Sequence, residues 1–196
     1  MDILCDIAGH LEDMKVIGEI QGGPAIESLA ERVAMSLDEL DDWWRGWITE
    51  NPEVCYEIES APDSTVILDD DGPLFPTVLQ YTSLSAAYLV CTHNCGRILL
   101  LHLQRCLGVL ATDPLSTSDA HSETVASDEH NKAPLLGICS DSRALAHEIM
   151  RSLDYCFEQA GGFMASFCVR VLQNEEYDTL DPGSREAEWL RKRDVN

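Results

Sequence analysis

The chain has 196 residues, 45% of them hydrophobic, which is enough to bury the core of one globular domain. Its 35 acidic and 13 basic residues give a formal net charge of -22 at pH 7. A surface this acidic repels phosphate groups, so we expect no direct contact with nucleic acid and no contact with anionic membranes.

Eight cysteines are scattered along the chain, and no two of them have the two-residue separation that is typical of structural zinc sites. We therefore expect no metal ion, no disulfide framework and no cofactor. The N-terminal segment MDILCDIAGH is acidic and lacks the sustained apolar stretch of a secretory signal. The expected compartment is a reducing one, either the nucleus or the cytoplasm.

Two helices are predicted at the start of the chain. Residues 1–23 hold an N-terminal helix whose apolar side chains repeat at helical spacing. Pro24 then stands where the first turn of a helix tolerates proline. A tryptophan-containing helix spans 24–51, and Asn51-Pro52 ends it.

The segment 52–82 is predicted to be a long loop. It holds four prolines and the acidic run Asp69-Asp70-Asp71-Gly72, and connections of this kind usually cross a surface. One piece, STVIL at 64–68, has the character of a short strand or an extended segment. No part of the chain predicts a convincing sheet.

The longest stretch with neither proline nor an acidic residue lies at 83–110 and predicts a long helix. This helix is apolar over most of its circumference, so we expect it to lie buried at the centre of the domain. Thr82 or Ser83 is the expected N-cap. The apolar run is interrupted in its middle by THNCGR, and we therefore do not interpret it as a membrane span.

Residues 112–134 are rich in Ser, Thr, Asp and His, which is the composition of a mobile insertion. Helical periodicity returns in 135–193, where the last helix has Ser184 as its expected N-cap. The sequence therefore predicts a single all-α domain, 1–196, of about six helices around a long buried central helix.

Three clusters are reminiscent of metal sites, and each fails on spacing. Cys91 and Cys95 share a helix face, but His93 lies on the opposite one, so core cysteines are favoured over a metal site. The acidic run of the long loop lacks the alternation of a calcium site. His147-Glu148 is followed by Arg151, where a zincin has its second histidine. No catalytic motif is recognisable, and we expect no enzyme activity.

Five side chains are candidates for binding a partner or an effector. Trp44 and Trp47 lie three residues apart on an acidic helix, where core packing is the favoured interpretation and a partner groove or ligand wall is the alternative. Tyr88, Arg97 and His102 lie on the central helix. If Arg97 is buried it needs an acceptor, because a guanidinium keeps its charge.

Several short motifs follow one another between residues 37 and 191: Trp44 and Trp47 with Asn51-Pro52, Phe75-Pro76, Tyr88 through Leu110, Ala146 through Ser152, Gly161 through Val171, and Glu186 through Leu190. In this order they resemble the C-terminal regulatory region of fungal zinc-cluster (Zn2Cys6) transcription factors. Each motif alone is weak, and the resemblance depends on their order and spacing together.

The resemblance implies a fungal-specific regulatory domain that acts through a protein partner, self-association or a small-molecule effector. The zinc-cluster DNA-binding module of that family is missing here, in agreement with the acidic charge. The alternative is a small-molecule-binding helical protein or an enzyme of fungal secondary metabolism, and a third interpretation is a domain without retained activity. The chain stops just after Trp189-Leu190, where the family continues, so a fragment, a short gene product and a degenerate relative all remain open.

Overall fold

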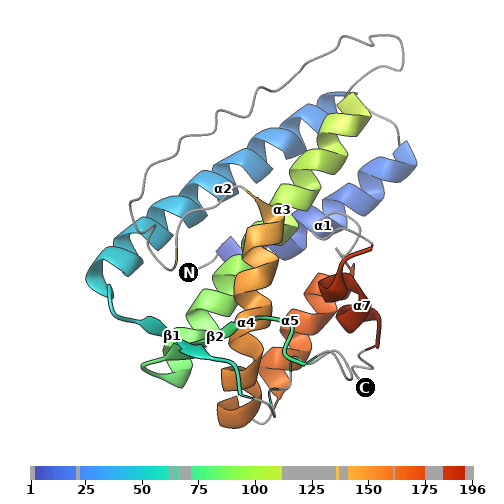
Figure 1. The fold of residues 1–196 in the computed structure, drawn as a ribbon. Helices are drawn as coiled ribbons and strands as arrows, with labels where there is room; N and C mark the ends of the chain where they lie inside the picture. The colour runs from blue at the N-terminus through green and yellow to red at the C-terminus, as the bar shows by residue number, and fades with distance from the viewer. Residues whose placement is uncertain are drawn as a thin grey trace, which may run out of the picture.

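The computed structural model describes residues 3–20, 23–61, 64, 66, 72–111, 136, 141–160, 162–174 and 183–192. Six helices and two strands lie within these residues (Figure 1), namely α1 (Ile3–Ile20), α2 (Gly23–Glu50), β1 (Cys55–Glu59), β2 (Thr77–Tyr81), α3 (Leu84–Ala111), α4 (Ser142–Ala160), α5 (Phe163–Asn174) and α7 (Arg185–Lys192). The predicted all-α fold of about six helices is confirmed, with one small sheet in addition.

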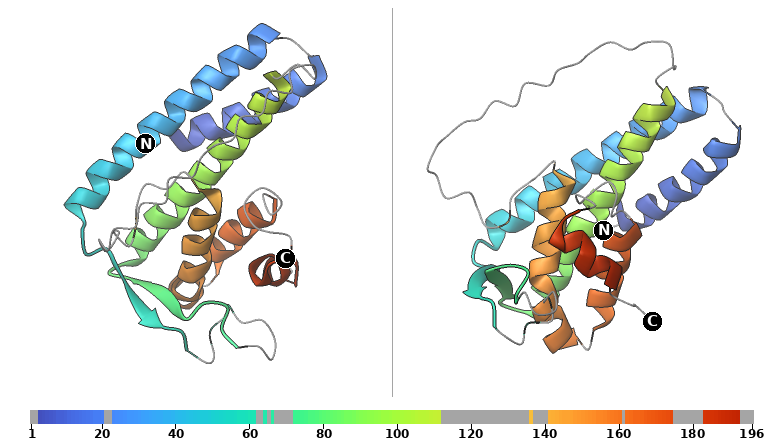
Figure 2. Two further views of the ribbon diagram at one scale, coloured as in Figure 1. Left: turned by 45° about the horizontal axis from the view of Figure 1, so that its top comes forward. Right: turned by 45° about the vertical axis from the view of Figure 1, so that its right-hand side comes forward.

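The long helix α3 lies at the centre of the arrangement. On one side it packs against α2 and α1, and on the other it packs against α4 and α5, with α7 resting on α5. Figures 1 and 2 show that α4 lies along the N-terminal half of α3, whereas α1 lies beside its C-terminal half. The two strands close the end of the molecule at which α3 begins.

Two hydrophobic cores are arranged along α3. The first, named the leucine core, joins α1, α2 and the C-terminal half of α3 and consists of Ile7, Ile17, Leu29, Val33, Leu37, Leu40, Leu100, Leu103 and Leu107. The second, named the mixed core, joins α2, α3, α4, α5, α7 and the sheet. Besides aliphatic side chains, it contains buried aromatic residues and cysteines, which are Trp44, Trp189, Tyr81, Tyr155, Cys91, Cys95, Cys156 and Cys168.

Short polar side chains fix where three of the helices begin. Ser83 Oγ accepts a hydrogen bond from the backbone N–H of Ala86 at 3.1 Å, which confirms Ser83 as the cap of α3. Ser184 Oγ accepts one from Ala187 N at 3.2 Å and starts α7 as predicted. Asp141, which the sequence analysis did not single out, accepts from Arg143 N at 2.9 Å at the start of α4.

The prediction of a long loop at 52–82, with a short extended piece at 64–68, is wrong in where it puts the strands, because Cys55–Glu59 and Thr77–Tyr81 pair as an antiparallel two-stranded sheet. The prolines that suggested a loop flank the strands at Pro52 and Pro76 and do not interrupt the ladder. The two strands are also far apart in the chain, so neither segment alone indicates that it pairs with the other. Of the predicted extended piece at 64–68 the structure describes Ser64 and Val66, neither of which lies in a strand.

α3 is long and apolar enough to cross a membrane by length and composition alone, but 61% of its most apolar stretch is buried inside the fold. Its last turn differs from the predicted buried helix, because Val109 is 73% exposed and Leu110 is 47% exposed. The predicted mobile insertion at 112–134 lies outside the described residues.

Candidate functional site

The tryptophans of α2 form a stack with a histidine of α3. The rings of Trp44 and His93 lie nearly parallel, with centroids 4.1 Å apart and an interplanar angle of 12°. Trp47 stacks on the outer side of Trp44 at 5.2 Å. Trp44 and His93 are buried, and Trp47 is partly exposed. Of the two candidates on α2, Trp44 therefore packs in the core, while Trp47 reaches the surface.

Arg97 is 5% exposed and forms an ion pair with Asp41 of α2. The acceptor that a buried guanidinium requires is thus supplied by the fold itself. The carboxylate and the guanidinium of this ion pair neutralise each other, so the charge of Arg97 is already balanced within the fold and needs no anionic ligand. This ion pair also fixes α2 against α3 between the two cores.

The other two candidates on α3 lie away from Arg97. His102 is partly exposed, and its Nε2 lies 3.3 Å from Cys106 Sγ one turn further along the helix. Tyr88 is partly buried and belongs to neither of the surface grooves described below. The five predicted side chains are therefore not gathered in one site, although Trp44 and Trp47 touch.

A chain of polar side chains, which the sequence analysis missed, connects α3 to α4. Asn94 Nδ2 donates to Glu148 Oε2 at 2.9 Å, and Asn94 Oδ1 accepts from His93 Nδ1 at 3.0 Å. The proton of the neutral His93 ring therefore sits on Nδ1. His93 Nε2 is buried and has no hydrogen-bond partner among the described residues. Protonating it would place an unpartnered donor in the core.

Burial shifts both ends of this chain toward their neutral forms. It lowers the pKa of His93 from 6.5 to about 4, against a smaller opposing effect of the Asn94 hydrogen bond. It raises the pKa of Glu148 from 4.5 to about 7, while Asn94 and Arg151 oppose the shift. Glu148 is thus the one of the two that titrates near neutral pH.

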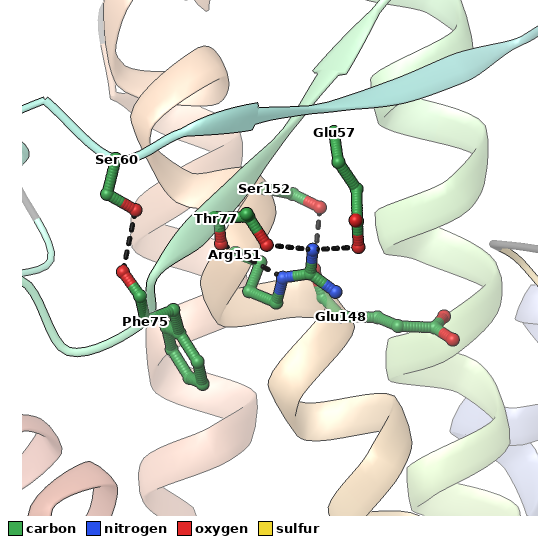
Figure 3. Close-up of polar contacts among 7 residues, drawn as sticks. All are labelled: Glu57, Ser60, Phe75, Thr77, Glu148, Arg151 and Ser152. Carbon is green, nitrogen blue, oxygen red and sulfur yellow. Dashed lines mark hydrogen bonds and ion pairs between the residues drawn. The ribbon is translucent and has the colours of Figure 1, made fainter.

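Arg151, one turn after Glu148 on α4, attaches the sheet to the helices (Figure 3). Its Nε donates to Thr77 O at 3.1 Å and its Nη2 donates to Thr77 Oγ1 at 2.8 Å. The same nitrogen forms an ion pair with Glu57 of β1. One side chain therefore reaches both strands, which a short two-stranded sheet needs because it is marginal by itself.

Four cysteines from three helices meet inside the mixed core, and all four are buried: Cys91, Cys95, Cys156 and Cys168. Cys91 Sγ and Cys156 Sγ lie 3.9 Å apart. Within the described part of the chain, no group of three or more His, Cys, Asp or Glu side chains could hold a metal ion. These thiols behave as small apolar side chains.

One surface groove has a volume of about 450 Å³ and is named the Trp47 groove. It lies where α2 ends and α3 begins. Its lining combines the Trp47 ring with hydroxyl, amide and carboxyl groups and a few aliphatic side chains, from Trp47, Asn51, Pro52, Glu53, Val54, Thr82, Ser83, Ser85, Ala86 and Leu89. An aromatic wall beside several hydroxyl groups suits a small polar molecule.

Another groove, named the Phe167 groove, has a volume of about 240 Å³ and lies between α1, α3 and α5. Apart from Thr92 its lining is apolar, and consists of Ile7, Ala8, Leu11, Thr92, Cys95, Gly96, Leu99 and Phe167. Phe167 is 43% exposed, and Phe163, one turn before it on α5, is 78% exposed. Two exposed phenylalanines beside an apolar groove are typical of a protein-binding surface.

The Phe167 groove could not be predicted from the periodicity of single helices, because three different helices form it. Phe163 and Phe167 repeat at helical spacing and were compatible with a core face; their exposure depends on which of the neighbouring helices cover that face.

A search of family models found no match to this chain, and neither curated proteins nor solved structures gave one.

Proposed function

We propose that this chain is a regulatory domain of the transcription-factor type that lacks its own DNA-binding module and acts by binding a protein partner. The observation that carries the proposal is the exposed Phe167 in an almost wholly apolar groove, with Phe163 beside it. The residues predicted to bind an effector give less support to a buried ligand site, because Arg97 is already paired with Asp41.

The partner is an amphipathic helix with a basic polar face. Residues of both α1 and α3 line the groove, and a helix lying between them would place apolar side chains into it at intervals of three and four. The α1 wall carries the exposed carboxylates Asp6 and Glu12 next to Ile7 and Leu11. Lysine or arginine on the outer face of the partner helix would meet these carboxylates.

The test uses a reporter gene and a matched pair of variants. The chain is fused to an unrelated DNA-binding module, and transcription from its target promoter is measured with the wild type, Phe167→Asp and Val109→Asp. Val109 is 73% exposed on the last turn of α3, outside the groove, so it receives the same charge without touching the surface in question. We expect Phe167→Asp to abolish the change in transcription and Val109→Asp to retain it.

Binding is measured directly by fluorescence anisotropy with a labelled helical peptide that has leucines on one face and lysines on the other. Phe167→Asp should lower the affinity for this peptide at least about tenfold, which is the loss expected when a central interface residue is replaced. Equal affinity for both variants, with both melting at the wild-type temperature, would contradict the proposal.

Small-molecule binding is the second candidate, and the Trp47 groove favours it. Its volume of about 450 Å³ lies in the range of ligand pockets. Native mass spectrometry of the chain purified from its own host should then show a retained small molecule. Ser85→Trp fills the groove from an exposed position and should remove that molecule, whereas Phe167→Asp should not.

A further inference from the structure

We propose that the outer edge of β1 is a second docking site, which takes an extended peptide with alternating apolar and basic side chains as an added antiparallel strand. The proposal uses a surface separate from the Phe167 groove and does not depend on the function proposed above.

The backbone of β1 has one paired edge and one edge that faces away from β2. Hydrogen bonds from Thr82 N to Val54 O (3.0 Å) and from Ser60 N to Pro76 O (3.1 Å) flank the ladder. In an antiparallel register such hydrogen-bonded pairs occur at every second residue, so Tyr56 and Ile58 direct their N–H and C=O groups toward β2.

The groups of Cys55, Glu57 and Glu59 therefore point outward. The sheet has two strands, and no backbone hydrogen bond to this outer edge is found among the described residues. β1 lies at the margin of the fold in each view of Figures 1 and 2. An open edge of this kind is a template for another strand.

The side chains of β1 define what the added strand must carry. Tyr56 is 53% exposed and Ile58 is 40% exposed, and they share one face of the strand. Glu57 and Glu59 share the other face and are exposed. A neighbouring strand alternates its side chains in the same way, so every second residue should be apolar and the residues between them basic.

Further carboxylates lie on the apolar face as well. A hollow of about 90 Å³ beside Ile58 is lined in part by Asp154 and Glu158 of α4. Asp154 already accepts a hydrogen bond from Ser64, whereas Glu158 is exposed. A lysine near the end of the added strand would reach this acidic hollow. On the opposite face the positively charged Arg151 forms an ion pair with Glu57 (Figure 3). Glu59 is therefore the carboxylate that attracts the peptide.

A second copy of the chain fits this edge poorly. Two β1 strands paired antiparallel about their centres would place Glu57 opposite Glu57, and like charges directly opposite each other destabilise a sheet. The edge of this acidic chain therefore favours a basic partner over itself.

The test measures the anisotropy of a labelled peptide of about seven residues, a common strand length, in which lysine and valine alternate. A second peptide of the same sequence carries N-methyl groups at alternate backbone positions, which keep the charge and remove the donors on one edge. We expect the parent peptide to bind, and the N-methylated peptide with its blocked edge toward β1 to bind at least about tenfold more weakly, because several backbone hydrogen bonds are lost together.

On the protein side, Glu59→Pro removes the outward N–H without touching the ladder to β2, and Glu59→Ala removes the same carboxylate but keeps the N–H. The proline variant should lower the affinity for the parent peptide several-fold more than the alanine variant does, and Phe167→Asp should leave this affinity unchanged.

Equal binding of both peptides to the wild type would overturn the proposal in favour of simple charge attraction. A wild-type dimer in sedimentation that Glu59→Pro converts to a monomer would overturn it in favour of self-pairing. If Glu59→Pro fails to fold, the comparison of the two peptides on the wild type still decides.

Discussion

The leucine core and the mixed core share α2 and α3 but are built from different side chains. The leucine core holds aliphatic groups, with one buried polar pair nearby in which His10 Nε2 lies 3.0 Å from Ser36 Oγ. The mixed core holds tryptophans, tyrosines and thiols, and beside it lie His93, Asn94 and Glu148. The stability of an aliphatic core depends on how well its side chains fill the space. The stability of a core with polar side chains also depends on each of them having its hydrogen-bond partner.

The largest expected effect comes from the ion pair between the cores. Asp41→Ala leaves the buried Arg97 without its carboxylate, and breaking a buried pair in this way costs about 3 to 5 kcal/mol of unfolding free energy. Asp42→Ala is the matched control, because Asp42 is exposed and pairs with Arg45 on the surface. Denaturant titration should show a loss below about 1 kcal/mol for the control. Equal losses for both variants would mean that the Arg97 pair contributes no more than a surface pair.

In the leucine core, Leu103→Ala should cost about 2 to 5 kcal/mol, because Leu103 is 1% exposed and its removal leaves a cavity. Leu99→Ala should cost less, since Leu99 is partly exposed and lines the Phe167 groove. Thermal or denaturant unfolding of the two variants measures the difference. A cost at Leu99 that matched the cost at Leu103 would place Leu99 in the core instead.

The mixed core should depend on pH through Glu148. Its pKa is raised by burial to about 7 in the folded chain against 4.5 ordinarily, so the folded state binds the extra proton between these values. The free energy of unfolding should therefore fall as the pH rises from about 4.5 to about 7, by about 3 kcal/mol at most. Glu148→Gln should remove this dependence.

His93 acts in the opposite direction. Burial lowers its pKa to about 4, so stability falls as the pH drops from 6.5 toward 4, when the unfolded chain takes up the proton first. His93→Gln separates the two slopes. Denaturant titrations at several pH values with each variant measure both. A wild type and Glu148→Gln variant with the same slope between pH 5 and 7 would contradict the shift of Glu148.

The smallest expected effect is at the start of α3. Ser83→Ala removes the cap that accepts from Ala86 N and should cost about 1 kcal/mol. Ser85→Ala is the control, because Ser85 is exposed on the same turn and makes no cap. Melting temperatures of the two variants check this prediction.

Much of the helical fold could be predicted from the sequence, because apolar side chains at intervals of three and four are a local signal. That signal identified α2 and α3, and short hydroxyl side chains identified Ser83 and Ser184 as caps. The pairing of Cys55–Glu59 with Thr77–Tyr81 could not be predicted in the same way, since it joins segments that are distant in the chain.

The candidate site was predicted less well for a related reason. The position of a tryptophan or arginine on an apolar helix indicates that the side chain is buried, but the residue that it contacts lies on another helix. Asp41 for Arg97 and His93 for Trp44 become visible once α2 and α3 are packed together. Trp47 at a groove was among the alternatives for the tryptophans, whereas exposed Phe163 and Phe167 depend on which neighbours leave that side of α5 uncovered.

The passage of α2 and α3 through both cores has a consequence for how the molecule opens. Neither core can lose its packing without exposing part of a helix on which the other depends, so the amide hydrogens in the middle of α3, from Val90 to Leu103, should exchange with solvent through global unfolding. A partner that binds the folded state at the Phe167 groove or at the edge of β1 would slow the exchange of these same amides. Occupation of either surface would thus be detected at one place, the centre of α3.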